Sequence, residues 1–302
     1  MIKKVIITGG SGFIGRHCLP LLIDYDYQVH AIARKPLLEI AHPNLFWHSV
    51  NLFDSDLVGN LITQIKPSHL LHLAWYAVPG SYITALENFR WVQASLELLQ
   101  MFTDGGGERV LMTGTCAEYD WQYGYCDEEL TPIAPSNPYS VCKYSLSQML
   151  SSFSSITGIS SAWGRVFWLY GQYEYPNRLV SSVIRSLLAD RVAECSSGYQ
   201  IRDYLYVNDV ANALVTILES ELNGAVNIGS GTPISIRQLV EQIATYLDRP
   251  NLVRFGMIPL QTQAANLVVA NCNRLQIGLN WEPKFSLIKG IENTVNFWKQ
   301  ES

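Results

Sequence analysis

The segment Pro138-Tyr139-Ser140-Val141-Cys142-Lys143 places a tyrosine and a lysine four positions apart. On an expected helix, this spacing puts both side chains on one face. Hydride transfer to or from a carbon that bears oxygen needs a proton partner, and a tyrosine can serve when its pKa, ordinarily about 10, is lowered. A nearby ammonium favours the phenolate, so we expect Lys143 to lower the pKa of Tyr139 and to hold ribose hydroxyls of a cofactor. Alone, this spacing is common by chance.

A hydroxyl that steadies the reacting oxygen is expected upstream, at the end of a strand. The run Leu111-Met112-Thr113-Gly114-Thr115 fits this position. A threonine hydroxyl there can form a hydrogen bond with the oxygen that gains or loses the proton. We take Thr115 as the third catalytic residue, with Thr113 as the alternative.

The first residues of the chain predict a strand, a glycine-rich turn and a helix. In this run Gly9, Gly12 and Gly15 follow one another at intervals of three. The first permits a sharp turn, the second lets the backbone approach a pyrophosphate, and the third lets the helix pack closely on the strand. The N–H groups and the dipole of the helix N-terminus favour phosphates. We therefore expect a dinucleotide here, with a purely structural turn as the alternative. The expected contact residues are Gly9, Ser11, Gly12, Phe13, Ile14 and Gly15.

The end of the second expected strand bears on the choice of cofactor. It reads His30-Ala31-Ile32-Ala33-Arg34-Lys35. A site that prefers NAD usually has Asp or Glu here, which holds the ribose 2′-hydroxyl. This chain has two cations instead, and a guanidinium can pair with a 2′-phosphate and stack on adenine. Arg34 and Lys35 therefore favour NADP(H) over NAD, and an ordinary solvated pair is the alternative.

Short apolar runs alternate with longer amphipathic runs through the first half of the chain. Expected strands are Lys4–Thr8, Gln28–Ala33, Leu45–Ser49, His69–Ala74, Arg109–Thr113, Ser161–Phe167 and Ala225–Ile228. Expected helices are Phe13–Tyr25, Leu57–Lys66, Ser81–Phe102, Tyr139–Thr157, Arg178–Asp190, Ile236–Leu247 and Ile288–Lys299. This alternation predicts an α/β fold with a doubly wound parallel sheet of Rossmann type and a smaller C-terminal lobe. A cleft between the two lobes is the expected ligand site.

The composition excludes several classes of protein. Of the 302 residues, 48% are hydrophobic and 16% charged, which is enough apolar material for a sizeable core and argues against disorder. The net charge is −5, whereas a nucleic-acid binder would normally carry a basic surface. No apolar run approaches a membrane span and none fits a leader, so we expect a cytoplasmic chain without a membrane partner. The cysteine spacing fits neither a zinc site nor a disulfide framework, so we expect free buried thiols and no metal.

Further motifs continue along the chain. They are His72-Leu73-Ala74, Arg202-Asp203-Tyr204-Leu205-Tyr206-Val207-Asn208-Asp209-Val210-Ala211, Asn227-Ile228-Gly229-Ser230-Gly231 and Leu279-Asn280-Trp281-Glu282-Pro283-Lys284. With the glycine turn and the Tyr139/Lys143 pair, they resemble the extended short-chain dehydrogenase/reductase family, in particular its NAD-dependent epimerase/dehydratase-like nucleotide-sugar enzymes. The resemblance covers nearly the whole chain.

That resemblance implies roles for individual residues. Tyr139 would be the acid/base, Lys143 its electrostatic partner and Thr115 the catalytic hydroxyl, while Arg202 would grip the nucleotide end of a nucleotide-linked sugar. The other matching positions on the cofactor side are Asn51, Leu52, Leu73, Ala74, Trp75 and Thr113. The matching positions on the substrate side are Thr115, Trp168, Arg178 and Arg202.

The family also implies an organisation of the chain. It predicts a dinucleotide-binding Rossmann domain at residues 1–168 and about 201–230. The substrate lobe would take residues 169–200 and 231–302. Such enzymes are usually homodimers that pair two long helices, here near residues 81–102 and 139–157.

Departures from the family pattern narrow the activity. The 4,6-dehydratases follow their threonine with Asp-Glu, which eliminates water from the sugar, whereas this chain has Cys116 and Ala117. Trp168 stands where many relatives carry a substrate-binding Asn, and Asn51 where an adenine-binding Asp is usual. A late Arg-x-x-Asp element that often grips the diphosphate is missing, and Gln261-Thr262-Gln263-Ala264 stands roughly there. These departures argue against dehydration and leave the diphosphate contacts open.

Three functions remain from the sequence. The first is an NADPH-dependent ketoreductase that acts on a nucleotide-linked 4-keto-6-deoxy sugar. The second is an epimerase with tightly held NAD, which oxidises and reduces the same carbon with the same three residues. The third is a non-catalytic dinucleotide sensor, although such proteins commonly lose the tyrosine or the lysine.

Overall fold

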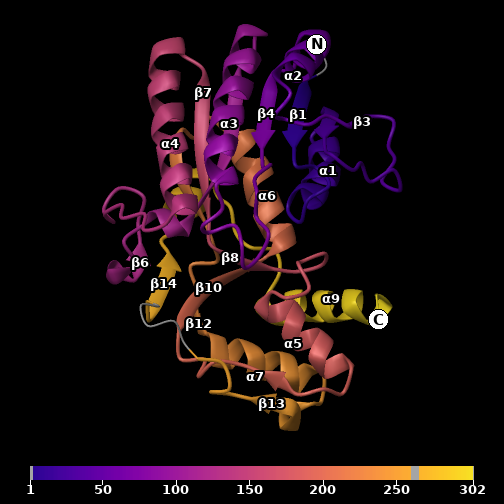
Figure 1. Cartoon of the computed structure of the whole chain (residues 1–302), viewed down its shortest axis with the longest axis vertical. Helices are drawn as coiled ribbons and strands as arrows, with labels where there is room; N and C mark the ends of the chain where they lie inside the picture. Colours follow the sequence, from indigo (N-terminus) through magenta and orange to yellow (C-terminus); the bar gives the residue numbers. More distant parts are fainter. Residues whose placement is uncertain (1–2, 260–264, 302) are drawn as a thin grey trace.

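Seven parallel strands form the larger of the two main sheets in the computed structural model, which describes residues 3–259 and 265–301 (Figure 1). Across the sheet the order is β11 (Gly224–Ile228), β7 (Ser160–Val166), β5 (Arg109–Thr115), β4 (His69–His72), β1 (Lys4–Thr8), β2 (Gln28–Ile32) and β3 (Leu45–His48). The strand order reverses at β1, between β4 and β2, and such a switch point is where open α/β sheets bind ligands. The predicted doubly wound α/β fold is confirmed.

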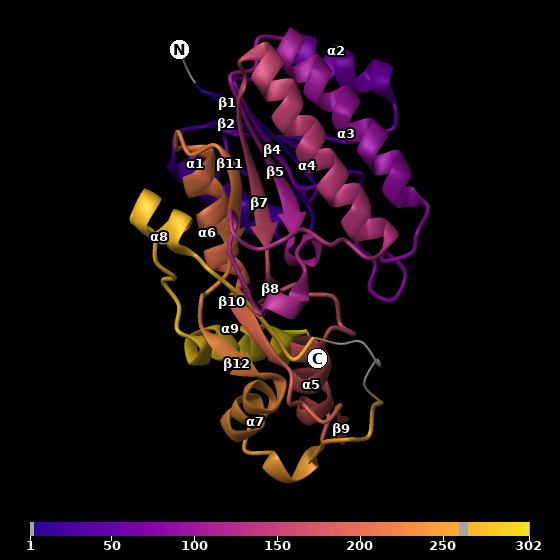
Figure 2. The same ribbon diagram turned by 90° about the vertical axis from the view of Figure 1, so that its left-hand side faces the viewer.

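Helices cover both faces of this sheet, as Figure 2 shows. One face carries α1 (Gly15–Asp24) and α6 (Val207–Leu218), and the other carries α2 (Ser55–Ile65), α3 (Glu87–Asp104) and α4 (Pro138–Thr157). Successive side chains of a strand point to opposite faces. In β1, Val5 and Ile7 therefore pack in the cluster with α1 and α6, while Ile6 packs in the cluster with α2, α3 and α4. Burial on both sides explains why the strand is a continuous apolar run.

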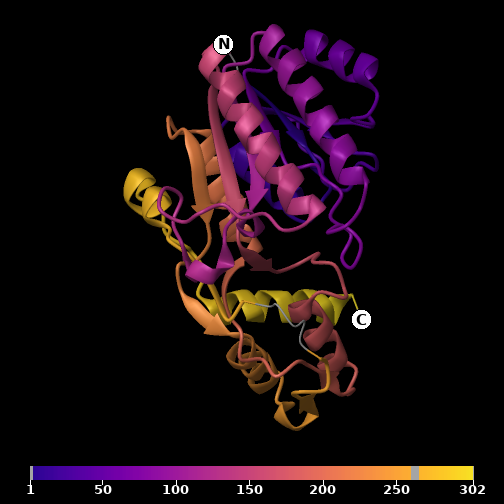
Figure 3. The ribbon, with the colours of Figure 1, turned by 60° about the vertical axis from the view of Figure 1, so that its left-hand side comes forward.

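A second sheet lies at the carboxyl ends of the large-sheet strands (Figure 3). Its order is β12 (Pro233–Ser235), β10 (Ile201–Tyr206), β14 (Leu267–Ala270) and β6 (Tyr125–Cys126), and β8 (Trp168–Tyr170) also pairs with β10. Around it pack α5 (Leu179–Leu188), α7 (Ile236–Tyr246) and α9 (Leu287–Gln300). The short strands β9 (Ala193–Glu194) and β13 (Val253–Arg254) pair with each other, and α8 (Asn273–Leu279) follows β14. Within the described ranges, no helix is long and apolar enough to cross a membrane.

The strand β10 bears on the domain division proposed from the sequence. It pairs with β8, β12 and β14 and with no strand of the large sheet among the described residues. The elements that follow β10 belong to the large sheet: α6 packs on one of its faces, and β11 is one of its strands. We therefore propose that residues 201–206 belong to the substrate lobe, and that the dinucleotide-binding part resumes at α6.

The helix predicted at Ser81–Phe102 begins later than expected, at Glu87. Its first buried side chain, Asn88, donates hydrogen bonds to the carbonyls of Tyr82 at 2.7 Å and Ala85 at 2.8 Å. These bonds hold the preceding residues as a turn, because an amide side chain competes with helical hydrogen bonding. Residues 75–86 are thus a loop, and the predicted start of this helix was wrong.

The start of α4 is fixed by its own sequence. Asn137 is the N-cap, and its side chain accepts the Ser140 N–H at 3.1 Å. Pro138 occupies the first helical position, where its missing N–H costs nothing. This cap places Tyr139 in the first turn and Lys143 one turn later, on the same side.

The tight packing of the glycine turn gives a first prediction. A Cβ atom at Gly15 would lie 2.2 Å from the Gly9 carbonyl oxygen and 2.8 Å from the Gly10 Cα. Both are backbone atoms, so Gly15→Ala should lower the free energy of unfolding by about 1–3 kcal/mol, measured in urea. The control is Gly278→Ala in α8, where a Cβ meets no heavy atom within 4 Å. Equal effects of the two substitutions would contradict this explanation.

Candidate active site

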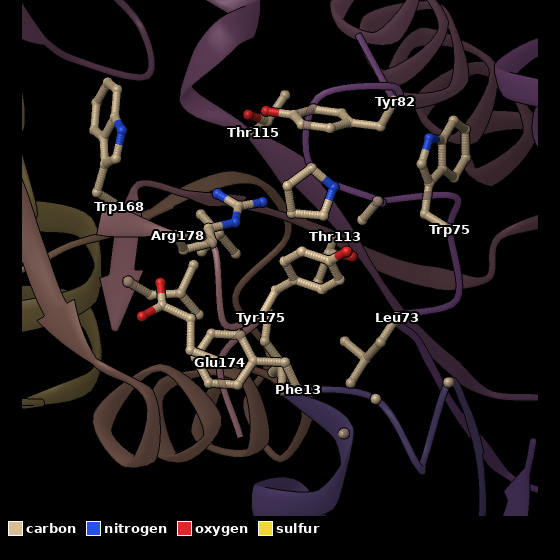
Figure 4. Close-up of a pocket in the computed structure, with 18 of the residues that line it drawn as sticks. Phe13, Leu73, Trp75, Tyr82, Thr113, Thr115, Trp168, Glu174, Tyr175 and Arg178 are labelled. Carbon is tan, nitrogen blue, oxygen red and sulfur yellow. The ribbon is translucent and has the colours of Figure 1, made fainter. Parts of the chain in front are cut away.

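A cavity of about 600 Å³ lies at the switch point of the large sheet (Figure 4). Its walls come from the β1–α1 turn, the ends of β4 and β5, the start of α4, and the segments around β8 and before α5. Figure 4 shows Leu73 and Trp75 on one side and Trp168 and Glu174 on the other. The cavity therefore joins the predicted cofactor region to the second lobe.

The structure brings most of the predicted site residues to this cavity. On the cofactor side the lining includes Gly9, Ser11, Gly12, Phe13, Ile14, Gly15, Leu73, Ala74, Trp75 and Thr113. The catalytic candidates Thr115, Tyr139 and Lys143 line it as well, and so do Trp168 and Arg178 from the substrate side. These residues come from distant parts of the chain and meet because parallel strands end at one edge of the sheet.

The glycine turn presents backbone, not side chains, to the cavity. Gly9 has a φ of +70°, and a Cβ there would lie 3.0 Å from the Ala74 nitrogen. A Cβ at Gly12 would lie 3.0 Å from the Gly9 carbonyl oxygen. The turn leads directly into the N-terminus of α1, whose N–H groups and dipole favour an anion. This arrangement fits the pyrophosphate of a dinucleotide.

Thr8 holds the ends of β1 and β4 together beneath this turn. Its hydroxyl lies 2.7 Å from His72 Nδ1 and accepts the N–H groups of Leu73 and Ala74, both at 3.2 Å. The other ring nitrogen of His72 lies 2.8 Å from Ser95 Oγ. Burial and the charge of Lys143 lower the pKa of His72 to about 3. The ring is therefore a neutral core group that fixes Leu73 and Ala74 through Thr8.

Tyr139 and Thr115 form a hydrogen bond through their side chains. Tyr82, from the loop before α3, packs edge-on against the Tyr139 ring with centroids 4.8 Å apart. Burial raises the pKa of Tyr139 well above its usual value, and the hydrogen bond from Thr115 only partly opposes this. The expectation that Lys143 lowers the pKa of Tyr139 does not hold in this structure, because burial dominates.

Lys143 is held by groups other than Tyr139. Its ammonium donates a hydrogen bond to the Thr113 carbonyl oxygen at 2.8 Å and lies 3.8 Å from the ring centre of Trp75. The indole N–H of Trp75 is bonded to Asn88 Oδ1 at 2.8 Å, which fixes the ring over the lysine. Burial lowers the pKa of Lys143 to about 7. The Lys143 ammonium therefore gains and loses its proton in the pH range around neutrality.

The substrate half of the cavity is aromatic. The rings of Trp121 and Trp168 lie 5.6 Å apart, and the Trp121 N–H is already bonded to the Cys116 carbonyl oxygen at 2.7 Å. Arg178 lines the same cavity, and its guanidinium lies 5.9 Å from the ring centre of Tyr82. This half thus offers flat apolar faces and one cation.

Five predicted contact residues are not among the described lining residues: Arg34, Lys35, Asn51, Leu52 and Arg202. Leu52 belongs to the core cluster around α2. Arg34, Lys35 and Asn51 are exposed near the ends of β2 and β3, and Asn51 Oδ1 accepts the Phe53 N–H at 3.2 Å. They lie outside the described lining of the cavity, and their contacts with a cofactor stay predictions.

Arg202 is not among the described lining residues of the cavity, and its guanidinium contacts other groups. Its guanidinium donates to the carbonyl oxygens of Ile201 at 2.8 Å and Ala265 at 2.9 Å. It also packs on the ring of Trp168, with 4.9 Å to the ring centre. Arg202 therefore supports Trp168, and its contact with the nucleotide stays a prediction. The predicted departure at Gln261 falls in residues 260–264, which lie outside the described ranges.

Sequence reasoning missed several lining residues. They are Arg16, Tyr82, Tyr173, Glu174 and Tyr175. Arg16 directly follows the glycine turn and could have been found from that position. The last three lie between β8 and α5, in a segment for which the sequence predicts neither a strand nor a helix, and nothing in its pattern indicates that it folds back over the cavity.

Glu174 is the one carboxyl side chain among the described lining residues. It is 4% exposed and accepts a hydrogen bond from the Ser181 hydroxyl at 2.8 Å. Burial raises its pKa to about 7.

Beside Thr115, the cavity wall is formed by Cys116 and Ala117, so the acid/base pair of a dehydratase has no counterpart at those positions.

Comparisons with known proteins place this site in context. A family model described as "NAD dependent epimerase/dehydratase family" matches residues 5–229. The chain is 27% identical over 255 residues to a dTDP-6-deoxy-L-talose 4-dehydrogenase (NAD(+)) of Aggregatibacter actinomycetemcomitans, which covers 79% of this chain and 88% of that protein. It is 26% identical to a CDP-abequose synthase of Salmonella typhimurium, with 96% of each covered.

A solved structure gives the same result. The UDP-N-acetylglucosamine 4-epimerase from Methanobrevibacter ruminantium M1, in complex with UDP-N-acetylmuramic acid, matches with a TM-score of 0.88 at 25% identity and 99% coverage of both chains. The resemblance inferred from the motifs is confirmed. The chain belongs to the NAD dependent epimerase/dehydratase family, whose members are nucleotide-sugar enzymes of the extended short-chain dehydrogenase/reductase type.

Proposed function

We propose that this enzyme reduces the keto carbon of a nucleotide-linked 4-keto-6-deoxy sugar with a nicotinamide dinucleotide. The observation that carries the proposal is the hydrogen-bonded pair Tyr139 and Thr115 in a cavity where Cys116 and Ala117 replace the carboxylates of a dehydratase. The relative named as a 6-deoxy-L-talose 4-dehydrogenase supports the position of the reacting carbon and the deoxy sugar. The apolar faces of Trp121 and Trp168 suit a sugar that has lost a hydroxyl.

The buried tyrosine is suited to the reductive direction. A bound nicotinamide dinucleotide supplies the hydride. Tyr139 keeps its proton at neutral pH because burial raises its pKa, so it can donate that proton to the carbonyl oxygen as charge develops there. Thr115 holds the same oxygen through its hydroxyl. Lys143, whose pKa of about 7 lies near neutrality, can then return a proton to the site.

We further propose NADP(H) as the preferred cofactor. Ala33, Arg34 and Lys35 follow β2, where a carboxylate would hold the 2′-hydroxyl of NAD. Arg34 and Lys35 are exposed and can meet a 2′-phosphate. The printed name of the talose relative specifies NAD(+), so NAD is the alternative.

An epimerase that retains NAD is the second candidate. The likeness to the Methanobrevibacter epimerase at 25% identity favours it. Tyr139, Thr115 and Lys143 serve both reactions, because an epimerase removes and returns a hydride at one carbon. The two candidates differ in whether the cofactor leaves after each turnover.

A homodimer is proposed from the outer faces of α3 and α4, which lie side by side (Figure 2). Along these helices several apolar side chains are exposed: Leu86, Phe89, Val141, Met149 and Ile156. Burial of such side chains between two chains favours association. We expect sedimentation equilibrium to give the mass of two chains, and Phe89→Glu to give one. Ile277→Glu on α8 is the control, and a monomeric wild type would contradict the proposal.

The proposed reduction is tested by loss of NADPH absorbance with a dTDP- or CDP-linked 4-keto-6-deoxy sugar. Tyr139→Phe should lower kcat by at least about 100-fold because the proton donor is gone, while NADPH still binds. The control is Tyr144→Phe, one helical position beyond Lys143 and outside the described lining, which should turn over normally. If NADPH stays untouched by wild type while NAD co-purifies, the epimerase is favoured instead.

The cofactor proposal is tested by titrating NADPH and NADH into the protein and following nucleotide fluorescence. Arg34→Ala should weaken NADPH binding by about 10-fold or more, since a charge-assisted contact is lost, and should leave NADH unchanged. Arg191→Ala is the control, because this exposed arginine lies beyond α5 in the second lobe. Unchanged NADPH affinity in Arg34→Ala would speak against the preference for NADP(H).

A further inference from the structure

Glu118 lies behind the catalytic Thr115 and is fully buried. It ends the short 3-10 turn Cys116–Glu118 that follows β5. One carboxylate oxygen accepts the Thr115 backbone N–H at 2.9 Å and the Trp163 indole N–H at 3.0 Å. The other accepts the Arg165 Nε–H at 2.7 Å. The carboxylate therefore holds the backbone of Thr115 in place.

The neighbouring glycine makes this approach possible. A Cβ at Gly114 would lie 2.4 Å from Glu118 Oε1 and 2.1 Å from Trp163 Nε1. Because Gly114 has no side chain, the carboxylate packs directly on the strand between Thr113 and Thr115. Thr113 in turn supplies the carbonyl that binds the Lys143 ammonium. Glu118 is thus adjacent to the backbone of both threonines that contact the catalytic groups.

Further buried hydrogen bonds connect Arg165, the partner of Glu118, to groups beyond it. Arg165 Nη1 donates to the Tyr119 hydroxyl at 2.8 Å, and Tyr119 donates to Asn227 Oδ1 at 2.8 Å. Asn227 then donates to the Cys126 carbonyl at 2.8 Å. A buried ion pair is not needed for stability as such, because packed apolar side chains of similar volume are often as good or better. The charge of Glu118 therefore calls for another explanation.

Several titratable groups face this charge. Arg165 comes from β7, Tyr139 and Lys143 from α4, Cys116 from the turn itself, and Tyr119 follows directly after it. His72 of β4 is affected by the charge of Lys143 and is kept neutral by burial. Lys143 also lies 6.0 Å from the ring centre of Trp163, the indole that binds Glu118.

The negative charge of Glu118 acts on both catalytic groups of α4. It raises the pKa of Lys143 against the larger lowering by burial, and it adds to the raising of the pKa of Tyr139. Both effects favour the protonated forms that a proton donor and its partner need. Without this charge, Lys143 would lose its proton below neutral pH.

We propose that Glu118 is a positioning residue for the reaction: its carboxylate fixes the backbone of Thr115 and places a buried negative charge behind the pair Tyr139 and Lys143. The proposal rests on the function proposed above, which assigns the reaction to these three residues. Glu118 is not among the described residues that line the cavity, so it acts on the reaction through its neighbours.

The test is an NMR titration of the full chain labelled with ¹³C at the lysine Cε, without cofactor or substrate. The signal of Lys143 is assigned by its absence in Lys143→Met. In wild type it should titrate near pH 7. In Glu118→Gln, which keeps the shape and removes the charge, the midpoint should fall by about one pH unit. Glu118→Asp keeps the charge and should restore most of the midpoint.

A matched control separates charge from structural support. Tyr119→Phe removes the bonds to Arg165 and Asn227 but leaves the Glu118 carboxylate in place. It should lower the thermal midpoint of unfolding and leave the Lys143 titration unchanged. If Glu118→Gln behaves in the same way as Tyr119→Phe, the carboxylate is only structural and the proposal is overturned.

If Glu118→Gln does not fold because Arg165 is left unpaired, Glu118→Gln is combined with Arg165→Gln to avoid a buried lone charge. Its Lys143 midpoint is then compared with that of Arg165→Gln alone, so that the two proteins differ only in the charge of Glu118, and equal midpoints contradict the proposal. Because the titration needs no substrate, its failure is distinct from a failure to reduce the ketosugar. Where reduction is observed, the alkaline limb of the kcat profile should move to lower pH in Glu118→Gln, and an unmoved limb contradicts the proposal.

Discussion

The contact between the ends of β1 and β4 sets the geometry of everything above it. The Thr8 hydroxyl binds His72 and both amides that follow it, and Gly9 then turns so closely past Ala74 that no side chain fits between them. Because the strand order reverses here, the chain must leave the sheet in two directions and a hollow results. The cofactor turn and the residues Leu73 to Trp75 form the walls of this hollow.

Burial has opposite effects on the two central titratable groups. It raises the pKa of Tyr139 and lowers that of Lys143, so both are driven towards their neutral forms. Nearby groups act against or with this tendency: the Thr115 hydrogen bond lowers the pKa of Tyr139, whereas Glu118 raises both. The pKa values of Tyr139 and Lys143 therefore depend on the residues around them as much as on their spacing along α4.

The features that local sequence determines were predicted well. The glycine intervals and the apolar runs located β1, α1 and the following parallel strands, because turn chemistry and burial on both faces leave a direct pattern. The strands β6, β8, β12 and β14 were not predicted, since each is two to four residues long and exists only through pairing with distant segments.

Among the site residues, the same distinction holds. Tyr139, Lys143 and Thr115 follow regular elements and reached the cavity as expected. Arg202 did not, because the choice between a ligand and its own backbone carbonyls depends on contacts that the sequence does not display. Glu174 was missed for the same reason, as it lies in a loop whose path is set by α5 and the cavity wall.

The passage from β7 to β8 has a mechanical consequence. Val166 ends a strand of the large sheet and Trp168 begins a strand of the small one, so Phe167 alone connects the two strands. Its side chain is 3% exposed and its amide donates to the Ile228 carbonyl at 3.0 Å, which leaves little freedom for rotation there. The two sheets are thus coupled nearly as one rigid frame at this point. Residues 75–86 and 171–178, which belong to no helix or strand, contribute further parts of the cavity wall beside this frame.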